Sequence, residues 1–494
     1  MKSMNKMELI AAPLSQAMER EVDTGKARGG PAFDGPKPLV QSQKEAVAFG
    51  QRFWAQYLKD SEGKPPDGEI YFKPQKMYSL MRQGGDGSPA PVRLLRLSWL
   101  LKQARRGAVL PRRQELPEEA FLSEVEVRAL PRGHVGEDCE TCGCQDGLTC
   151  KLLTDDLRAD KPLRIISISH GWLTPEHPDP FGEQLRRFAK QVERERQCCP
   201  GSCFEIGFSL FCNVLCLGFC AGYCCYVIPA SGQQCGDTLN QLPSGEFGVF
   251  YDYGSLHQKD AKGQRTEPEQ AAFGTALKTM GMWYAHRLTT TVILSELPPG
   301  WPRSAEAAPF FPEGWLRGKG WPSFERAVSG MIKRGTGSSF RRIVDPAVPR
   351  GLFGFSGYRA PPMHPREFAA ELSRKVFSNG ADCEVVARLY ADTFSAALGE
   401  ARVLNFASLE WRDGDAEAFA KVLPLLRRVE TLAMSANYIG TRGFAALAAA
   451  IREGAAPALK EFDFRTNNDH GDSTALKEAC EARGIRTRSQ RDVS

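Results

Sequence analysis

The sequence lacks the signals that mark a secreted or glycosylated protein. Its first 20 residues hold one short apolar run, residues 9–14 beside Glu8, which is too short for a secretory signal. No Asn-x-Ser/Thr sequon occurs in the 494 residues. The formal net charge of +5 is small for this length and gives no argument for nucleic-acid binding. We therefore expect a cytoplasmic protein that does not bind nucleic acid.

Two common catalytic motifs are also absent. No Gly-x4-Gly-Lys-Ser/Thr phosphate loop occurs, which excludes a nucleotide-switch receptor of that type. No Gly-x-Ser-x-Gly nucleophile elbow occurs, since the glycines and serine at residues 354–357 lack the spacing. His170 and His177 lie in a Pro-rich loop with Glu176 and Asp179. The alternatives there are a metal site and a rigid loop at the edge of a sheet, and we expect the loop without a metal.

The composition is that of an ordinary globular protein. Hydrophobic residues make up 42% and charged residues 25% of a chain long enough for about three domains. We predict an irregular helical and linker region over residues 1–160 and an α/β domain over 161–345, with a cysteine-rich apolar insertion at 197–243. A helical connector over 360–398 and a repeat array over 399–490 follow.

Two segments of the N-terminal region have helical spacing of their apolar residues. Residues 42–58 form one, and residues 92–106 form a basic amphipathic pattern with leucines along one face. A helix of the second kind either lies on an anionic membrane or a partner, or packs on its own domain. We expect it to pack on its own domain.

The central region alternates strand and helix patterns. Buried strands are predicted at residues 163–169, 247–253 and 290–297, where apolar and β-branched residues run together. Helices are predicted at 182–196 and 271–287. Such alternation is typical of a parallel sheet with helices on both faces, which predicts a three-layer α/β fold.

Each predicted strand leads toward polar and aromatic residues. The motifs are Ser-His-Gly-Trp at 169–172, Tyr-Asp-Tyr-Gly-Ser-Leu-His-Gln at 251–258 and Arg-Gly-Lys-Gly-Trp-Pro-Ser-Phe-Glu at 317–325. Ligands of parallel α/β folds bind at the carboxyl ends of the strands. The residues expected at that edge are Trp172, Asp252, Gln258 and Glu325.

Trp321 and Glu325 are four residues apart at the start of a helical pattern, so they share one face of a helix. This arrangement places an acid beside an aromatic wall that can hold a sugar or a nucleotide. The alternative is structural, with Trp321 as a half-buried anchor and Glu325 in solvent.

The three motifs, in this order, resemble the heterokaryon-incompatibility (HET) domain, a family similar to the Toll/interleukin-1 receptor (TIR) fold. The resemblance covers roughly residues 161–335. Asp252 and Gln258 keep the spacing of the family's second motif, and Trp321 and Glu325 match its last one.

Two positions depart from the HET pattern. Ser255 stands where the family usually has cysteine, and Lys319 interrupts Arg-Gly-Trp. TIR domains that hydrolyse NAD carry a Trp-x-x-x-Glu-like motif on the helix where Glu325 lies, so the resemblance implies that Glu325 is catalytic. Cleavage of the nicotinamide–ribose bond builds positive charge on the sugar, which a carboxylate stabilises, so no cofactor is required. The residues implied to bind the substrate are Trp172, Asp252, Gln258, Trp321 and His170.

Thirteen of the 15 cysteines lie between Cys139 and Cys235. The first group consists of Cys139, Cys142, Cys144 and Cys150, whose spacing matches no common zinc finger. The alternatives are one zinc ion and reduced thiols in a loop, and we expect reduced thiols.

Residues 206–229 within the insertion are uncharged and long enough for a membrane helix. A true span would place two halves of one sheet on opposite sides of a membrane. The remaining alternatives are a membrane-attached or acylated insertion, which we favour, and an apolar insertion that covers the edge of the domain.

The C-terminal part contains a repeat. The pattern Val-x2-Leu-x-Met-x2-Asn at residues 429–437 recurs as Leu-x2-Phe-x-Phe-x2-Asn at 459–467, and a weaker copy runs through Leu404. The period of 28 to 30 residues resembles the ribonuclease-inhibitor type of leucine-rich repeat (LRR), which implies a protein partner. The asparagine is predicted to satisfy backbone groups at the turn after each strand.

Two functions are consistent with these features. The first is a signalling protein whose HET/TIR-like domain hydrolyses NAD, acts when self-associated and is controlled by a repeat sensor. The second is a catalytically inactive interaction scaffold of the same architecture. The enzyme requires Glu325 and Asp252 to line one enclosed site, whereas the scaffold leaves Glu325 in solvent or in a salt bridge.

Overall fold

The computed structural model describes residues 38–40, 42–61, 67–130, 163–196, 245–303, 311, 314–333, 343–346, 358–377, 381–467 and 471–488. The cysteines at 139–150 and the apolar insertion at 197–243 lie outside these residues, so the zinc, thiol and membrane predictions stay predictions. Within the described part of the chain, no helix has the length and apolar character needed to cross a membrane.

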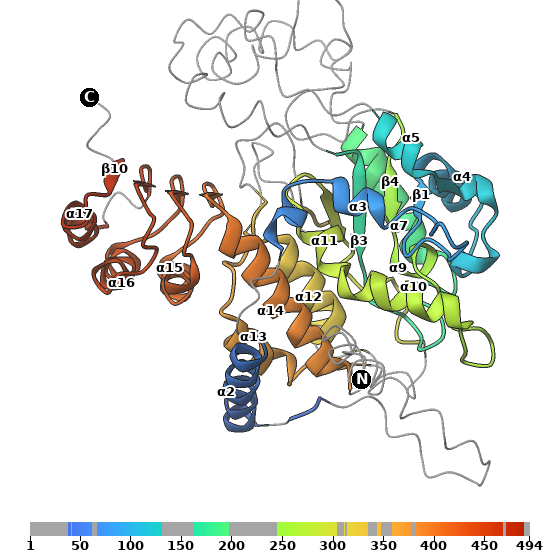
Figure 1. The fold of residues 1–494 in the computed structure, drawn as a ribbon, viewed down its shortest axis with the longest axis horizontal. Helices are drawn as coiled ribbons and strands as arrows, with labels where there is room; N and C mark the ends of the chain where they lie inside the picture. The colour runs from blue at the N-terminus through green and yellow to red at the C-terminus, as the bar shows by residue number, and fades with distance from the viewer. Residues whose placement is uncertain are drawn as a thin grey trace, which may run out of the picture.

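The protein has a mixed α/β fold built on a six-stranded, mainly parallel sheet (Figure 1). The strands are β1 (Leu94–Arg96), β2 (Phe121–Leu122), β3 (Ile165–Ser169), β4 (Gly248–Phe250), β5 (Thr290–Ile293) and β6 (Ile343–Val344). Their order is β2-β1-β4-β3-β5-β6, in which β3 to β6 are parallel and β1 and β2 antiparallel. The prediction that Phe250 and Val292 lie in one sheet is confirmed. β3 lies between them.

The described residues form α-helices of 4 to 19 residues. They are α2 (Gln43–Asp60), α3 (Gln75–Ser79), α4 (Leu97–Arg105), α5 (Glu124–Ala129), α7 (Glu183–Arg196), α9 (Asp252–Ser255), α10 (Glu267–Lys278), α11 (Met280–Ala285), α12 (Gly320–Ser329), α13 (Pro365–Leu372), α14 (Asp382–Glu400), α15 (Asp413–Ala420), α16 (Thr441–Arg452) and α17 (Thr474–Glu481). The predicted single helix at 271–287 is therefore wrong, because it divides into α10 and α11 at Thr279, whose backbone is not helical.

The prediction of one helix over residues 92–106 is also wrong in its first half. Leu94 and Leu95 belong to β1, which pairs with β2 on one side and β4 on the other. Both leucines are fully buried, on opposite faces of the sheet, as successive residues of a strand are. The sheet therefore begins before residue 161, the predicted start of the α/β domain. The rest of the segment, α4, packs against α7 as expected.

Helices cover both faces of the sheet because successive strand residues point to opposite sides. Ile165 and Phe250 belong to one apolar cluster, which includes residues of α11, α12 and α14. Ile166 and Val249 belong to the other, which includes residues of α4 and α7. The loops that leave the carboxyl ends of β3, β4 and β5 emerge at one edge between these layers.

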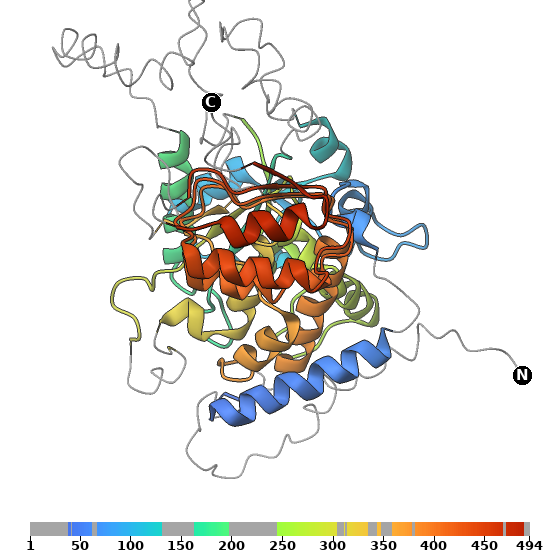
Figure 2. The same cartoon turned by 90° about the vertical axis from the view of Figure 1, so that its left-hand side faces the viewer.

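The C-terminal units form a second, four-stranded parallel sheet, stacked as Figure 2 shows. The strands are β7 (Val403–Asn405), β8 (Thr431–Ala433), β9 (Glu461–Asp463) and β10 (Arg486–Arg488). Leu404 pairs in register with Leu432, and Leu432 with Phe462. The prediction that these three residues occupy adjacent parallel strands is confirmed.

Asn437 joins two neighbouring units through its side-chain amide. Its Oδ1 atom accepts hydrogen bonds from the backbone N–H groups of Leu409 (2.9 Å) and Trp411 (3.1 Å). Its Nδ2 group donates to the carbonyls of Phe406 and Met434, both at 2.9 Å. The asparagine therefore satisfies buried backbone groups, as the repeat pattern predicts.

Helix α14 connects the two sheets. It packs against α11 and α12 of the α/β layers, and its buried residues belong to the same apolar cluster as those of the repeats. Helix α2 packs along α13 on the outside of this connector, as Figure 2 shows. The helical connector predicted over 360–398 is thus a packed part of the core.

Candidate functional site

Three of the predicted site residues meet at the carboxyl ends of β3 and β4. Asp252 is the first residue of α9, and His170 and Trp172 follow β3. The Trp172 indole N–H donates to Asp252 Oδ2 at 3.2 Å, and His170 Nε2 lies 3.5 Å from Asp252 Oδ1. The buried His170 ring stacks on Tyr251, with 4.6 Å between ring centroids. Asp252 therefore organises the group, and its side chain keeps 19% exposure.

Glu325 approaches the same edge from α12 and is buried, with 5% exposure. Burial, and then the nearby charge of Asp252, raise the pKa of its carboxyl to about 8. The hydroxyls of Ser169 and Tyr284 oppose this shift in the pKa, but Ser169 Oγ makes no hydrogen bond of ordinary geometry. Glu325 Oε2 has no hydrogen-bond partner among the described residues. The Glu325 carboxyl therefore holds a proton at neutral pH.

Lys319 is a third site group, which the sequence pattern indicated only as an interruption of Arg-Gly-Trp. It precedes α12, is buried, and donates through Nζ to the carbonyl of Trp172. Its Nζ atom lies 4.4 Å from the centroid of the Trp315 ring. Burial lowers the pKa of the Lys319 ammonium to about 7. Because a Cβ atom on Gly171 would lie 2.7 Å from Trp315, glycine is required for this close packing.

Trp321 lies apart from the Asp252 group, although it shares α12 with Glu325. Its indole N–H donates to Asp382 Oδ2 at 2.8 Å, at the start of α14, and its ring meets Phe324 edge-on. The contacts of Trp321 match the structural alternative, a half-buried anchor for the helix. Those of Glu325 do not, because this carboxyl is buried rather than solvated.

Gln258 stabilises the loop after α9 instead of facing the site. Its amide Nε2 donates to the carbonyls of Asp252 (3.1 Å) and Leu256 (3.2 Å). Gln114 in turn donates to the carbonyl of Gln258 at 2.8 Å and to Glu269 at 3.2 Å. Gln258 thus acts on Asp252 through the backbone.

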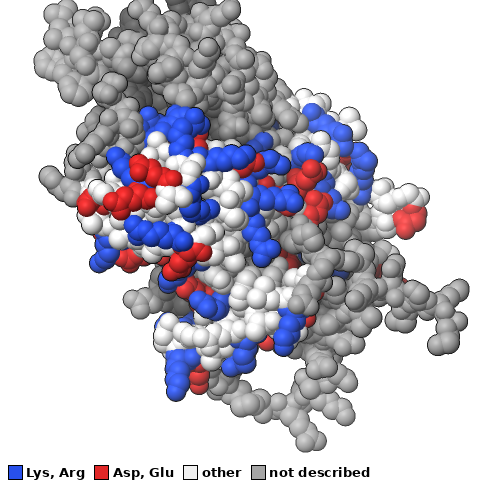
Figure 3. Space-filling model, turned by 60° about the vertical axis from the view of Figure 1, so that its left-hand side comes forward, with Lys and Arg blue, Asp and Glu red and all other residues white. Residues whose placement is uncertain are grey.

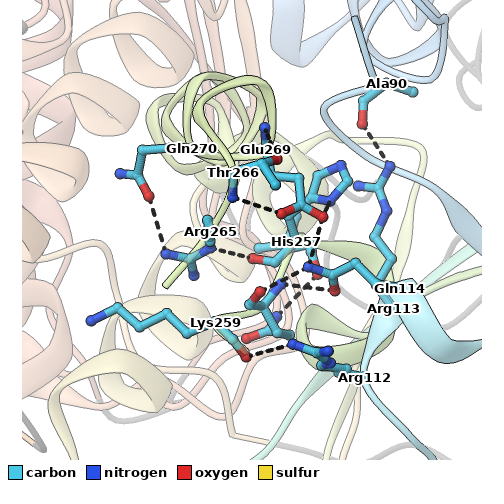
Figure 4. Close-up of polar contacts among 12 residues, drawn as sticks. Ala90, Arg112, Arg113, Gln114, His257, Lys259, Arg265, Thr266, Glu269 and Gln270 are labelled. Carbon is cyan, nitrogen blue, oxygen red and sulfur yellow. Dashed lines mark hydrogen bonds and ion pairs between the residues drawn. The ribbon is translucent and has the colours of Figure 1, made fainter. Parts of the chain in front are cut away.

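Figure 4 shows the polar contacts that hold this loop between the N-terminal segment and α10. Arg265 donates to the carbonyl of His257 at 2.7 Å, and Arg112 donates to that of Lys259 at 3.1 Å. His257 is buried 3.5 Å from Glu269. Burial, and then the charge of Arg113, lower the pKa of His257 to about 4, so the ring is neutral at physiological pH.

The loop after β3 is held by its own polar side chains. His177 Nε2 lies 2.9 Å from the Leu110 carbonyl, and its Nδ1 accepts from the backbone N–H of Asp179. Asp179 accepts hydrogen bonds from the N–H groups of Glu183 and Leu185 at the start of α7. These contacts describe a rigid loop. Among the residues that the structure describes, no three His, Cys, Asp or Glu side chains are grouped so that they could hold a metal ion.

The site therefore contains two carboxyl groups in different environments, one partly exposed and one buried, beside a half-buried tryptophan. Carboxyl groups held in unlike environments can divide acid, base and charge-stabilising roles between them. No family model, curated protein or solved structure matches this chain.

Proposed function

We propose that the α/β domain is a HET/TIR-like domain that hydrolyses NAD at the nicotinamide–ribose bond. The observation that carries the proposal is the burial of Glu325 beside Asp252 at the carboxyl edge of the parallel sheet. Among the described residues, Glu325 makes no ion pair with a basic side chain, so no cation of the protein competes with a ligand for this carboxyl. A carboxyl held in this way is costly to ionise unless a positive charge is near it.

NAD supplies that charge because its nicotinamide ring is a cation. Entry of the ring beside Asp252 lowers the pKa of Glu325 and favours its carboxylate form. The C–N bond then breaks, nicotinamide leaves with the bonding electron pair, and the sugar cation faces the Glu325 carboxylate. Water adds to the sugar carbon, and a carboxylate accepts its proton. Trp172, oriented by Asp252, stacks the nicotinamide or the adenine.

The C-terminal units would act as an LRR recognition module for a protein partner. Basic and acidic side chains alternate along their strand ends, where Glu430 pairs with Arg402 and Lys460. Figure 3 shows Lys and Arg interspersed with Asp and Glu on this side of the molecule. A partner with mixed charge fits such a surface better than a polyanion does. The proposed signalling protein would act in the cytoplasm. It would self-associate and attach to a membrane through residues 206–229.

The test is release of nicotinamide from NAD by the purified full chain, concentrated on beads so that copies are clustered. We expect Glu325→Gln to reduce the rate roughly a hundredfold or more, because it keeps the shape and removes the charge. The matched control is Glu119→Gln, which changes an exposed carboxyl away from the site. Absence of release from clustered, folded protein would reject the enzyme.

The second candidate is a catalytically inactive interaction scaffold. It is favoured by the small exposure of Glu325, which leaves little of the carboxyl open to solvent before a ligand arrives. In that case Glu325 would serve only to fill the space among Asp252, Ser169 and Tyr284. Glu325→Gln would then leave partner capture by the clustered chain unchanged.

A further inference from the structure

Four aromatic rings form a continuous row between the loops that follow β3 and β5. The ring centroids of Phe181 and Trp301 are 5.9 Å apart, those of Trp301 and Phe311 5.7 Å, and those of Phe311 and Trp315 4.9 Å. Exposure falls along the row, from 46% at Phe181 to 7% at Trp315. The row thus leads from the surface into the protein.

The inner end of the row contacts the group around Asp252. Trp315 lies against Gly171, and the ammonium group of Lys319 lies over its ring. Lys319 donates a hydrogen bond to the carbonyl of Trp172. Trp172 in turn donates to Asp252. The inner end of the row is therefore joined to the Asp252 group by side-chain packing and hydrogen bonds.

The row also lies where the strand order of the sheet reverses. The chain passes from β3 to β4 on one side and then crosses to β5 on the other side of β3. Loops diverge at such a point and leave the crevice in which nucleotides bind in open α/β sheets. Phe181 and Trp301 come from the two loops that bound it.

Polar contacts hold the outer end of the row in place. The Trp301 indole N–H donates to Glu183 Oε2 at 2.6 Å, and Arg303 pairs with Glu183 Oε1 at 2.9 Å. The Arg303 guanidinium lies 4.0 Å from the centroid of the Phe181 ring and 5.1 Å from that of Trp301. Phe181 and Arg303 nevertheless remain 46% exposed, so their outer surfaces are open. Side chains fixed in this way lose little entropy when a flat ligand stacks on them.

We propose that Phe181, Trp301 and Arg303 form a stacking subsite for the purine ring of a free nucleotide. Every base offers a flat π-face to an aromatic ring or to a guanidinium, and the exposed half of Arg303 can meet a phosphate. The assignment to the adenine half of NAD rests on the proposed function. A free nucleotide fits better than a nucleic acid strand because the row ends at the buried Trp315, beside the Asp252 group.

The experiment titrates AMP into the full-length protein and follows binding by isothermal titration calorimetry. Phe181→Ala and Trp301→Ala should each weaken AMP binding roughly tenfold, as loss of one stacking partner does. The matched control is Trp54→Ala, which removes a partly exposed tryptophan on α2 and should leave the affinity unchanged. Because Phe181 is exposed, Phe181→Ala should keep the far-UV circular dichroism of the parent, and the proposal remains testable even where Trp301→Ala fails to fold.

Three results would overturn the subsite: no AMP binding at millimolar concentration, an affinity that Phe181→Ala leaves unchanged, or tighter binding of a single-stranded oligoadenylate than of AMP. The outcome for the enzyme is separate. If AMP binding depends on Phe181 but no nicotinamide is released, the subsite proposal is supported and NAD hydrolysis is rejected. If nicotinamide is released and Phe181→Ala does not raise the KM for NAD, the hydrolase proposal is supported and the subsite is rejected.

Discussion

The burial of Glu325 makes the free energy of unfolding depend on pH. The pKa of this carboxyl rises from 4.5 to about 8 in the folded protein. Between these two values the folded protein keeps a proton that the unfolded chain has released, so stability falls as the pH rises. The slope is about 1.4 kcal/mol per pH unit. At pH 7, about 2.5 units above 4.5, the cost of burying this group is on the order of 3 kcal/mol.

Glu325→Gln removes the titration and keeps the shape of the side chain. We expect the variant to become more stable relative to the parent as the pH rises. The difference between their free energies of unfolding should grow by about 3 kcal/mol between pH 5 and pH 8. Urea unfolding of both proteins, followed by circular dichroism at four pH values in this range, measures the difference. Glu119→Gln, an exposed change, should give curves parallel to the parent. If the unfolding free energy of Glu325→Gln also changes with pH in parallel with that of the parent, Glu325 ionises freely in the folded protein. The proposed role of its burial is then wrong.

Four further outcomes follow from the same contacts. Because the carboxylate form of Glu325 is the active one, kcat/KM for NAD should rise with pH through about 8; a fall above pH 8 in the pH–rate profile would indicate a proton donor instead. Trp172→Ala should raise KM more than it lowers kcat in steady-state assays, since its ring binds rather than reacts. Asn437→Ala should lower the urea-unfolding free energy by roughly 2 kcal/mol or more, because it leaves buried backbone groups unpaired. Truncation after residue 399 should leave the α/β layers folded, since α14 keeps most of its length against α11 and α12; loss of protease resistance would contradict this.

Local patterns in the sequence determined the elements of the fold and the repeat register. The strands near Ile166, Val249 and Val292 follow from short apolar runs, because side-chain alternation and β-branching act within a few residues. The pairing of Leu404 with Leu432 follows from the repeat period, since equivalent positions of stacked units must coincide. The alternation of strand and helix patterns likewise predicted that Trp172 and Asp252 lie at one edge of the sheet.

Only the tertiary structure decided what surrounds those side chains. Nothing in the pattern around Leu94 shows that its segment pairs as a strand with β4, because that pairing joins residues about 150 positions apart. Trp321 and Glu325 share a helix, yet one bonds to Asp382 and the other is buried with a raised pKa. The burial of a side chain, its dielectric environment and the charges near it depend on residues that are distant in the chain. The chemistry of the site therefore depends on how the layers pack.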